Sequence, residues 1–144
     1  MADTIYGKIN KWLLEYTPLN NWLYFNATPI IIGTVAMNMV AGDRVTQSFI
    51  DGSKKRQVVF AIDMVTEYDG SGTSDVNMDA LAEVEAFMRW IEVQKTTPDF
   101  GEKCNVEKIE VLTNVPNLFI NEQSQLAKYQ FQTRIEYKDE SEVG

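Results

Sequence analysis

The chain contains no histidine among its 144 residues and only one cysteine, Cys104. Without an imidazole, the sequence cannot form the catalytic triads, dyads and metal sites that depend on histidine. A single cysteine cannot form a disulfide within the chain, and one thiolate cannot hold a metal ion by itself. We therefore predict that the protein is not an enzyme and that it uses no cofactor and no metal ion.

Long apolar segments are missing as well. The longest apolar run lies around Ile30 to Ile32 and is far too short to cross a bilayer. The first residues lack the basic stretch and following apolar run that define a signal peptide. These absences, together with the scarcity of cysteine, predict synthesis in the cytoplasm and no association with a membrane.

Two common motifs for phosphate binding and nucleophilic catalysis are absent: a glycine-rich loop followed by lysine, and Gly-x-Ser-x-Gly. In the loop from Asp69 to Asp75, acidic and hydroxyl side chains take alternate positions, which superficially suggests a calcium site. The third acidic position and the closing glutamate of that motif are missing, so a solvated loop is the favoured interpretation. The loop is still the best support for an alternative in which the chain is a small ligand-binding α+β domain.

Basic residues are outnumbered, because 21 acidic residues stand against 13 basic ones and the net charge at neutral pH is −8. An acidic chain repels phosphate backbones, so specific binding of nucleic acid is not expected. The same acidity suits a surface along which DNA slides without sticking. The length and an apolar share of 44% fit a single domain, residues 1–144, with a sizeable core.

The clearest positive signal is the alternation of apolar and polar side chains in residues 127–137. Successive side chains of a strand point to opposite faces, so this pattern predicts one long strand with an apolar and a polar face. Residues 35–68 read as two extended runs around the turn signal Asp51-Gly52-Ser53, which predicts a long β-hairpin. The outer part of the hairpin, from Gly42 to Gln57, is polar, so we expect it to project from the domain.

Two segments show the spacing of amphipathic helices. The apolar stripes are Ile5, Ile9, Trp12, Leu13 and Tyr16 in residues 1–17, and Leu81, Val84, Phe87, Met88 and Ile91 in residues 75–96. Ser74 or Asp75 is expected to cap the second helix. Docking of the first helix on its own sheet is favoured over docking on a neighbouring subunit.

The order of elements, without strand-helix-strand alternation, predicts an α+β fold. We expect a mostly antiparallel sheet with the long projecting β-hairpin and two helices packed on one face. Residues 138–144 are acidic and are expected to form a disordered tail.

The outer part of the hairpin carries a basic cluster, defined as Arg44, Lys54, Lys55 and Arg56. One interpretation is a charged tip that prevents edge-to-edge aggregation. The other is an electrostatic contact with an acidic neighbouring subunit. A basic tip and an acidic face on one molecule would permit head-to-tail association, which closes into a ring if the rotation allows.

Several segments resemble one protein family. They are Phe60-Ala61-Ile62, the loop to Asp75, the helix from Glu83 to Ile91, Val106 to Pro116, and Ala127 to Tyr137. The turn from Leu112 to Pro116, followed by Ala127-Lys128-Tyr129-Gln130-Phe131, carries most of the likeness. Over roughly residues 58–137 the chain resembles the minor capsid proteins of long-tailed (siphovirus-type) bacteriophages, which are similar to tail terminator proteins.

The resemblance implies a structural virion protein, made in the host cytoplasm, that forms a homo-oligomeric ring, expected to be a hexamer. Such a ring caps the tail tube, binds head-completion or connector proteins, and lets DNA pass through its lumen without specific binding. The predicted interface residues are Arg44, Lys54, Lys55 and Arg56, and the acidic residues expected to face the lumen are Asp79, Glu83 and Glu85. A nearby alternative is another head-tail joining, minor capsid or tube protein of the same particle.

Overall fold

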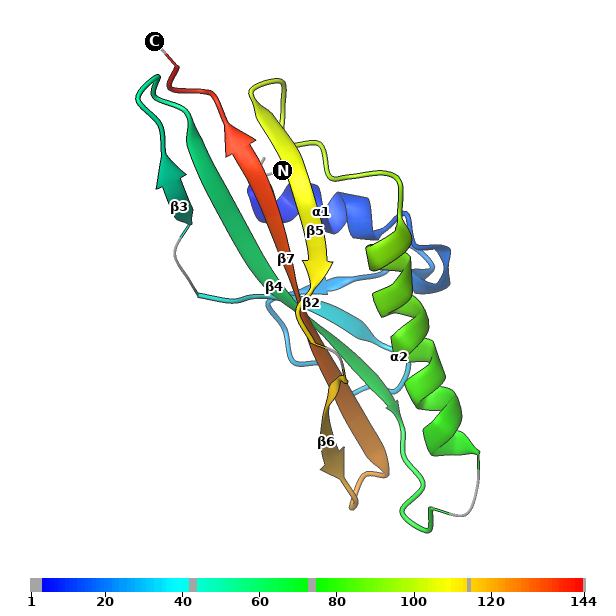
Figure 1. Ribbon diagram of the computed structural model, residues 1–144. Coiled ribbons are helices and arrows are strands. Elements are labelled where there is room, and N and C mark those ends of the chain that lie inside the picture. The colour runs from blue at the N-terminus through cyan, green and yellow to red at the C-terminus, as the bar shows by residue number, and fades with distance from the viewer. Residues whose placement is uncertain (1–3, 42–43, 73–74, 114, 144) are drawn as a thin grey trace.

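The computed structural model describes residues 4–41, 44–72, 75–113 and 115–143 (Figure 1). Its helices are α1 (Ile5–Leu13) and α2 (Val76–Val93), with a short 3-10 turn at Thr17–Leu19. Its strands are β1 (Tyr24–Phe25), β2 (Val35–Met39), β3 (Val45–Ser48), β4 (Lys54–Glu67), β5 (Cys104–Val111), β6 (Asn117–Asn121) and β7 (Leu126–Asp139). Over the described residues this is an α+β fold with a mixed, mostly antiparallel seven-stranded sheet, as predicted.

Strands β4 and β7 form the centre of the sheet. They pair antiparallel without a break from Lys54 opposite Asp139 to Glu67 opposite Leu126. The other edge of β4 pairs with β2 and β3, and the other edge of β7 pairs with β5 and β6. Strand β1 pairs with β2 in the parallel direction, which makes the sheet mixed.

The predicted hairpin is present, with β2 and β3 as successive partners of β4. Its outer end extends well beyond α2 (Figure 1). This end does not stand alone, because β7 follows β4 along the whole of its length. The projecting part of the domain is therefore a sheet that includes β3, β4, β7 and the start of β5.

Both helices pack on one face of the sheet, and the core lies between the helices and this face. The buried side chains of this face are Val58, Phe60, Ile62 and Met64 of β4, and Ala127, Tyr129, Phe131, Thr133, Ile135 and Tyr137 of β7. Phe87 of α2 stacks on Tyr16 with a centroid distance of 4.5 Å and meets Phe131 edge to face at 5.9 Å. Each fully buried side chain of this size stabilises the fold by roughly 1.5–3 kcal/mol.

Helix α1 docks on its own sheet, which confirms the favoured prediction. Ile9, Trp12 and Leu13 are buried in the same core cluster as the residues of α2 and the sheet. The indole Nε1 of Trp12 donates to the backbone oxygen of Thr96 over 3.1 Å, so α1 is also held to the segment that follows α2. Thr4 caps α1, since its Oγ1 accepts a hydrogen bond from the backbone of Gly7.

The helices are shorter than predicted at their ends. Helix α1 ends at Leu13 because the chain tightens into the 3-10 turn that contains Pro18. Helix α2 covers Val76–Val93, and Asp75 occupies its N-cap position without a capping hydrogen bond from its side chain. Ser74, the other predicted cap, lies outside the described residues.

The prediction of a disordered tail over residues 138–144 is wrong for the residues that the structure describes. Lys138 and Asp139 belong to β7, and the backbone N–H of Glu140 donates to the oxygen of Lys103 over 2.7 Å. A side chain at Gly52, whose φ is +93°, would collide with the backbone oxygen of Glu142. The tail is ordered because the hairpin brings basic side chains to its carboxylates, and Gly144 lies outside the described residues.

Candidate functional site

The described residues contain no group of three or more histidine, cysteine, aspartate or glutamate side chains that could hold a metal ion. No helix in the described part of the chain is long and apolar enough to cross a membrane. In the loop that superficially suggested calcium, Asp69 accepts hydrogen bonds from the N–H and hydroxyl of Ser71, and Thr73 lies outside the described residues.

The basic cluster is partly neutralised within the chain. The ammonium of Lys54 lies 2.6 Å from a carboxylate oxygen of Glu142, and Arg56 lies 2.8 Å from Asp139. Arg44 and Lys55 make no ion pair within the described residues. Of the four residues predicted to form an interface, two therefore hold the tail of their own chain, and two keep a charge available for another molecule.

Asp139 is the most perturbed carboxylate of this region. Hydrogen bonds from Ser141, followed by the Arg56 guanidinium, lower its pKa from 3.8 to about 2, against the opposing effect of burial. The carboxylate oxygen that accepts from Ser141 also accepts a weak hydrogen bond from the Cys104 thiol, with a sulfur–oxygen distance of 3.6 Å. Burial and the negative charge of Asp139 raise the pKa of Cys104, so the thiol stays protonated and is a poor nucleophile.

Beside the hairpin, a hollow of about 410 Å³ opens between α1 and strands β2 and β4. Its lining is mostly apolar and includes Ile5, Tyr6, Met39 and Val58, with Arg44 and Arg56 among its polar residues. The ion pair of Arg56 with Asp139 leaves Arg44 as the cation available there. The hollow therefore suits an apolar group, alone or beside one negative charge.

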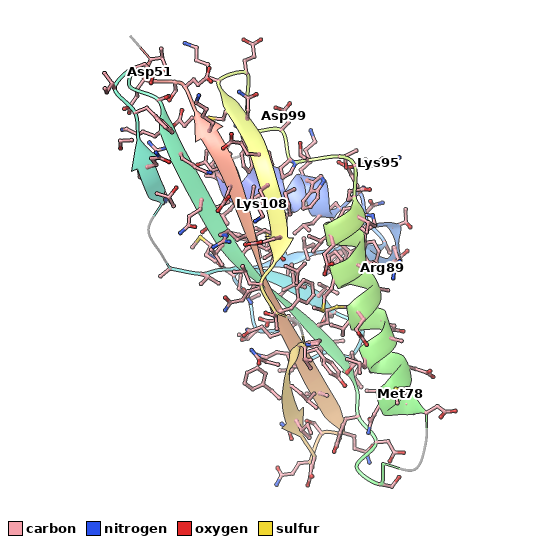
Figure 2. All side chains as sticks on the ribbon, viewed as in Figure 1. Asp51, Met78, Arg89, Lys95, Asp99 and Lys108 are labelled. Atoms are coloured by element: carbon pink, nitrogen blue, oxygen red, sulfur yellow. The ribbon has the colours of Figure 1, made fainter. Side chains whose placement is uncertain are left out.

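The three acidic residues expected to face a lumen are all exposed on α2. Asp79 and Glu83 are one helical turn apart, and Glu85 precedes Arg89 by one turn on a neighbouring line of the helix. The prediction that they face a lumen stays open, since the structure describes one copy of the chain. Figure 2 places Arg89 and Met78 on the helix, with Met78 at the end of the molecule far from Asp51.

The sheet face opposite the helices contains a buried carboxylate that sequence reasoning missed. Asp63 of β4 is only 2% exposed. Its two oxygens accept hydrogen bonds from the amides of Asn38 on β2, over 2.5 Å, and Gln130 on β7, over 2.7 Å. The oxygen of the Asn38 side chain accepts the N–H of Ala27, which ties the preceding loop to the sheet. An acidic residue inside an otherwise apolar strand was the available signal for this network.

A row of charged side chains continues across this polar face. Arg134 of β7 lies between Glu110 of β5 and Glu136 of its own strand and pairs with both. Lys108 of β5, labelled in Figure 2, adds a further ion pair with Glu110, with a nitrogen–oxygen distance of 3.1 Å. These pairs are half-exposed and contribute little stability each, but they neutralise this part of the polar face.

Three of the exposed apolar groups among the described residues lie in β6, in the loop before β2 and at the hairpin turn. In β6, Leu118, Phe119 and Ile120 are 45–52% exposed, although the sequence suggests an ordinary apolar strand. The other two groups are Ile30 to Ile32 in the loop before β2 and Phe49 with Ile50 at the hairpin turn. Strand β6 pairs only with β7 among the described strands, so its other edge is open. Exposed apolar strands of this kind mark candidate protein interfaces.

A scan against protein-family models finds no match for this chain, and a search of curated proteins finds none either. The resemblance to phage tail terminators therefore depends on the sequence segments given above. The features that the structure adds are the open edge of β6, the partly neutralised basic cluster and the acidic outer side of α2.

Proposed function

We propose that this protein is a structural virion subunit of the tail terminator type, which assembles with copies of itself into a ring. The ring caps the tail tube and joins it to the head-completion proteins, and DNA passes through its lumen. The observation that carries the proposal is the open, apolar edge of β6, which offers backbone and side-chain groups for pairing with another protein chain.

The distribution of charge supports the same function. The exposed side of α2 carries Asp79, Glu83 and Glu85, and the chain as a whole has a net charge of −8. A lumen lined by such carboxylates would repel the DNA backbone and reduce friction during passage.

A second candidate, a small ligand-binding domain, is favoured by the hollow beside the hairpin. Its lining combines apolar side chains with a guanidinium, which is a common composition for a ligand site. This alternative predicts that the isolated protein binds a small molecule with a mostly apolar body and one negative charge. The ring proposal predicts that the same hollow is covered on assembly.

The first experiment is the solution mass of the purified protein by light scattering, over a range of protein and salt concentrations. A discrete species near six subunits supports the ring, and its weakening by salt supports a role for the charged residues. A protein that stays monomeric under all conditions contradicts the self-assembly part of the proposal.

A second experiment separates the roles within the particle. Particles are produced without this chain and examined by electron microscopy. Tails of excessive length without heads support a tail terminator, because growth of the tube is then no longer stopped. Heads without any tube would instead assign the chain to the tube or to an earlier joining step.

A further inference from the structure

We propose that neighbouring copies of this chain join by antiparallel pairing of β6 of one copy with β3 of the next, which forms one continuous sheet across the assembly. The inference depends on the self-assembly proposed above and assigns its interface. Among the described residues, β6 and β3 are the two strands whose residues are all exposed and that have one neighbour each. They lie at opposite ends and on opposite edges of the sheet (Figure 1).

Both strands turn unpaired backbone groups outward. The N–H of Leu112 donates to the oxygen of Gln132, so the even-numbered residues of β7 direct their backbone groups toward β5 and β6. In that register the backbone groups of Phe119 form hydrogen bonds with β7, and the backbone groups of Leu118 and Ile120 point away from β7. On β3, the N–H of the following residue, Phe49, donates to Ser53, which leaves the backbone groups of Ser48 on the open side.

The strand directions allow this pairing without turning a copy over. Strand β6 is parallel to β4, and β3 is parallel to β7, because each is antiparallel to its own partner in the central pair. Strands β6 and β3 are therefore antiparallel to each other. A second copy that is only displaced in the plane of the sheet presents its β6 antiparallel to β3 of the first, with the helices of both copies on the same side.

The register fixes the displacement between neighbouring copies when Phe119 of one lies opposite Gln47 of the next. Phe119 is level with Val65 of β4, through Lys128, and Gln47 is level with Lys55, ten positions away. The second copy is thus displaced about 33 Å along the strands and about 19 Å across them, for four strand spacings, or about 38 Å in total. Repeating this step without rotation extends an open ribbon, so closure into a ring requires a rotation of each copy relative to the last. The displacement along the strands also prevents a clash between β6 of the second copy and β2 of the first, because β2 and β3 pair with different parts of the same edge of β4.

Charge favours this unlike pairing. Glu122, in the turn beside β6, makes no ion pair within the described residues, and in this register it lies close to Arg44 of the next copy. Arg44 also makes no ion pair within the described residues, and Lys55 on the neighbouring strand β4 is opposite another cation, Lys138. The carboxylate of Glu122 and the guanidinium of Arg44 therefore attract each other across the proposed interface, while Lys128, the cation opposite Phe119, lies over the Phe119 ring of its own copy.

The apolar side chains also match. Leu118 and Ile120 are opposite Tyr129 and Ala127, so they lie on the helix-bearing face of the sheet. The hollow beside the hairpin opens on that same face and is lined by Ile5, Tyr6 and Val58. The occupant that fits β3 and this hollow is therefore β6 of a second copy.

Proline substitution tests the backbone pairing. Leu118→Pro removes an outward N–H and leaves the bonds between β6 and β7 intact, so the monomer keeps its fold while assembly weakens. We expect the concentration for half-assembly to rise at least about tenfold, the effect of one lost hydrogen bond of about 1.4 kcal/mol. Leu118→Thr keeps the N–H and is the matched control for the side chain, and circular dichroism confirms that each variant is folded.

Disulfide cross-linking tests which strands meet. Two proteins are prepared in a Cys104→Ser background, one with Ser48→Cys and the other with Leu118→Cys. We expect a cross-linked dimer on oxidation of the mixture and little from either protein alone. Cross-linking of the Leu118→Cys protein with itself overturns the unlike pairing in favour of a twofold dimer.

Charge exchange provides a third readout. Arg44→Glu and Glu122→Lys should each weaken assembly, and the two together should restore it. Assembly that survives Leu118→Pro and shows no cross-link overturns this interface while the ring proposal stands. A protein that never assembles overturns both proposals.

Discussion

The guanidinium Nε of Arg56 donates to a carboxylate oxygen of Asp139 over 2.8 Å, although the two residues are 83 positions apart. The pair joins the outer end of β4 to the last residue of β7, and both side chains are largely buried. Asp139 also accepts hydrogen bonds from Ser141 and Cys104. This single carboxylate therefore holds together the hairpin, the start of β5 and the residues after β7.

Asp139→Asn is expected to destabilise the protein at neutral pH and to have little effect in strong acid. Folding lowers the pKa of Asp139 from 3.8 to about 2, which corresponds to about 2 kcal/mol of stability above the unfolded pKa. This contribution is present above about pH 5 and is lost as the pH falls through the folded pKa near 2. Urea unfolding of both proteins between pH 7 and pH 2 measures the difference.

The matched control for this experiment is Glu140→Gln, which removes a more exposed carboxylate from the next position. It should change the free energy of unfolding by much less. A difference between Asp139→Asn and the parent protein that stays constant down to pH 2 would contradict the assignment of the stability to the ionised Asp139.

Asp63→Asn is expected to lower the free energy of unfolding by about 1–3 kcal/mol, because it turns an amide donor toward the amide donors of Asn38 or Gln130. The substitution keeps the size of the side chain, so a cavity is not the cause. A double-mutant cycle with Gln130→Ala isolates the contact across β4 and β7. Additive effects of the two substitutions would show that the carboxylate is not stabilised by Gln130.

Trp12→Ala is expected to lower the stability of the isolated subunit by about 3–5 kcal/mol. The side chain is 2% exposed, packs on Trp90 with a centroid distance of 5.2 Å and donates to Thr96. Denaturant unfolding at a concentration where the protein is monomeric gives the value. Trp22→Ala is the control, since Trp22 is 63% exposed. An unchanged monomer with impaired assembly would mean that α1 serves a neighbouring subunit.

Local periodicity made much of the fold predictable. Alternation over residues 127–137 indicated both a strand and the face that it buries, and every predicted inward residue from Ala127 to Tyr137 is buried. The helical stripes were equally informative, because Ile9, Trp12 and Leu13 take the inner side of α1 as their spacing indicates. These features depend on residues within a few positions of each other, which a sequence displays directly.

The candidate site was less predictable, because it depends on contacts between distant segments. The triplet Leu118-Phe119-Ile120 indicates a strand, but only the sheet order places it at an edge, because β6 pairs with β7 and with no other described strand. The cluster of four basic residues looked uniform, yet Lys54 and Arg56 have intramolecular partners in the tail, and Arg44 and Lys55 make no ion pair within the described residues.

The amino-acid sequence by itself determined the elements, their inward faces, the acidic balance and the absence of histidine chemistry. The tertiary structure alone decided which charges are neutralised, that the tail is ordered through residue 143, and that β3 and β6 are fully exposed strands at opposite edges of the sheet. The physical reason is that a side chain's periodicity is a local property of the chain. Strand order and ion pairing depend instead on how segments many residues apart meet, and that is settled only when the whole core is packed.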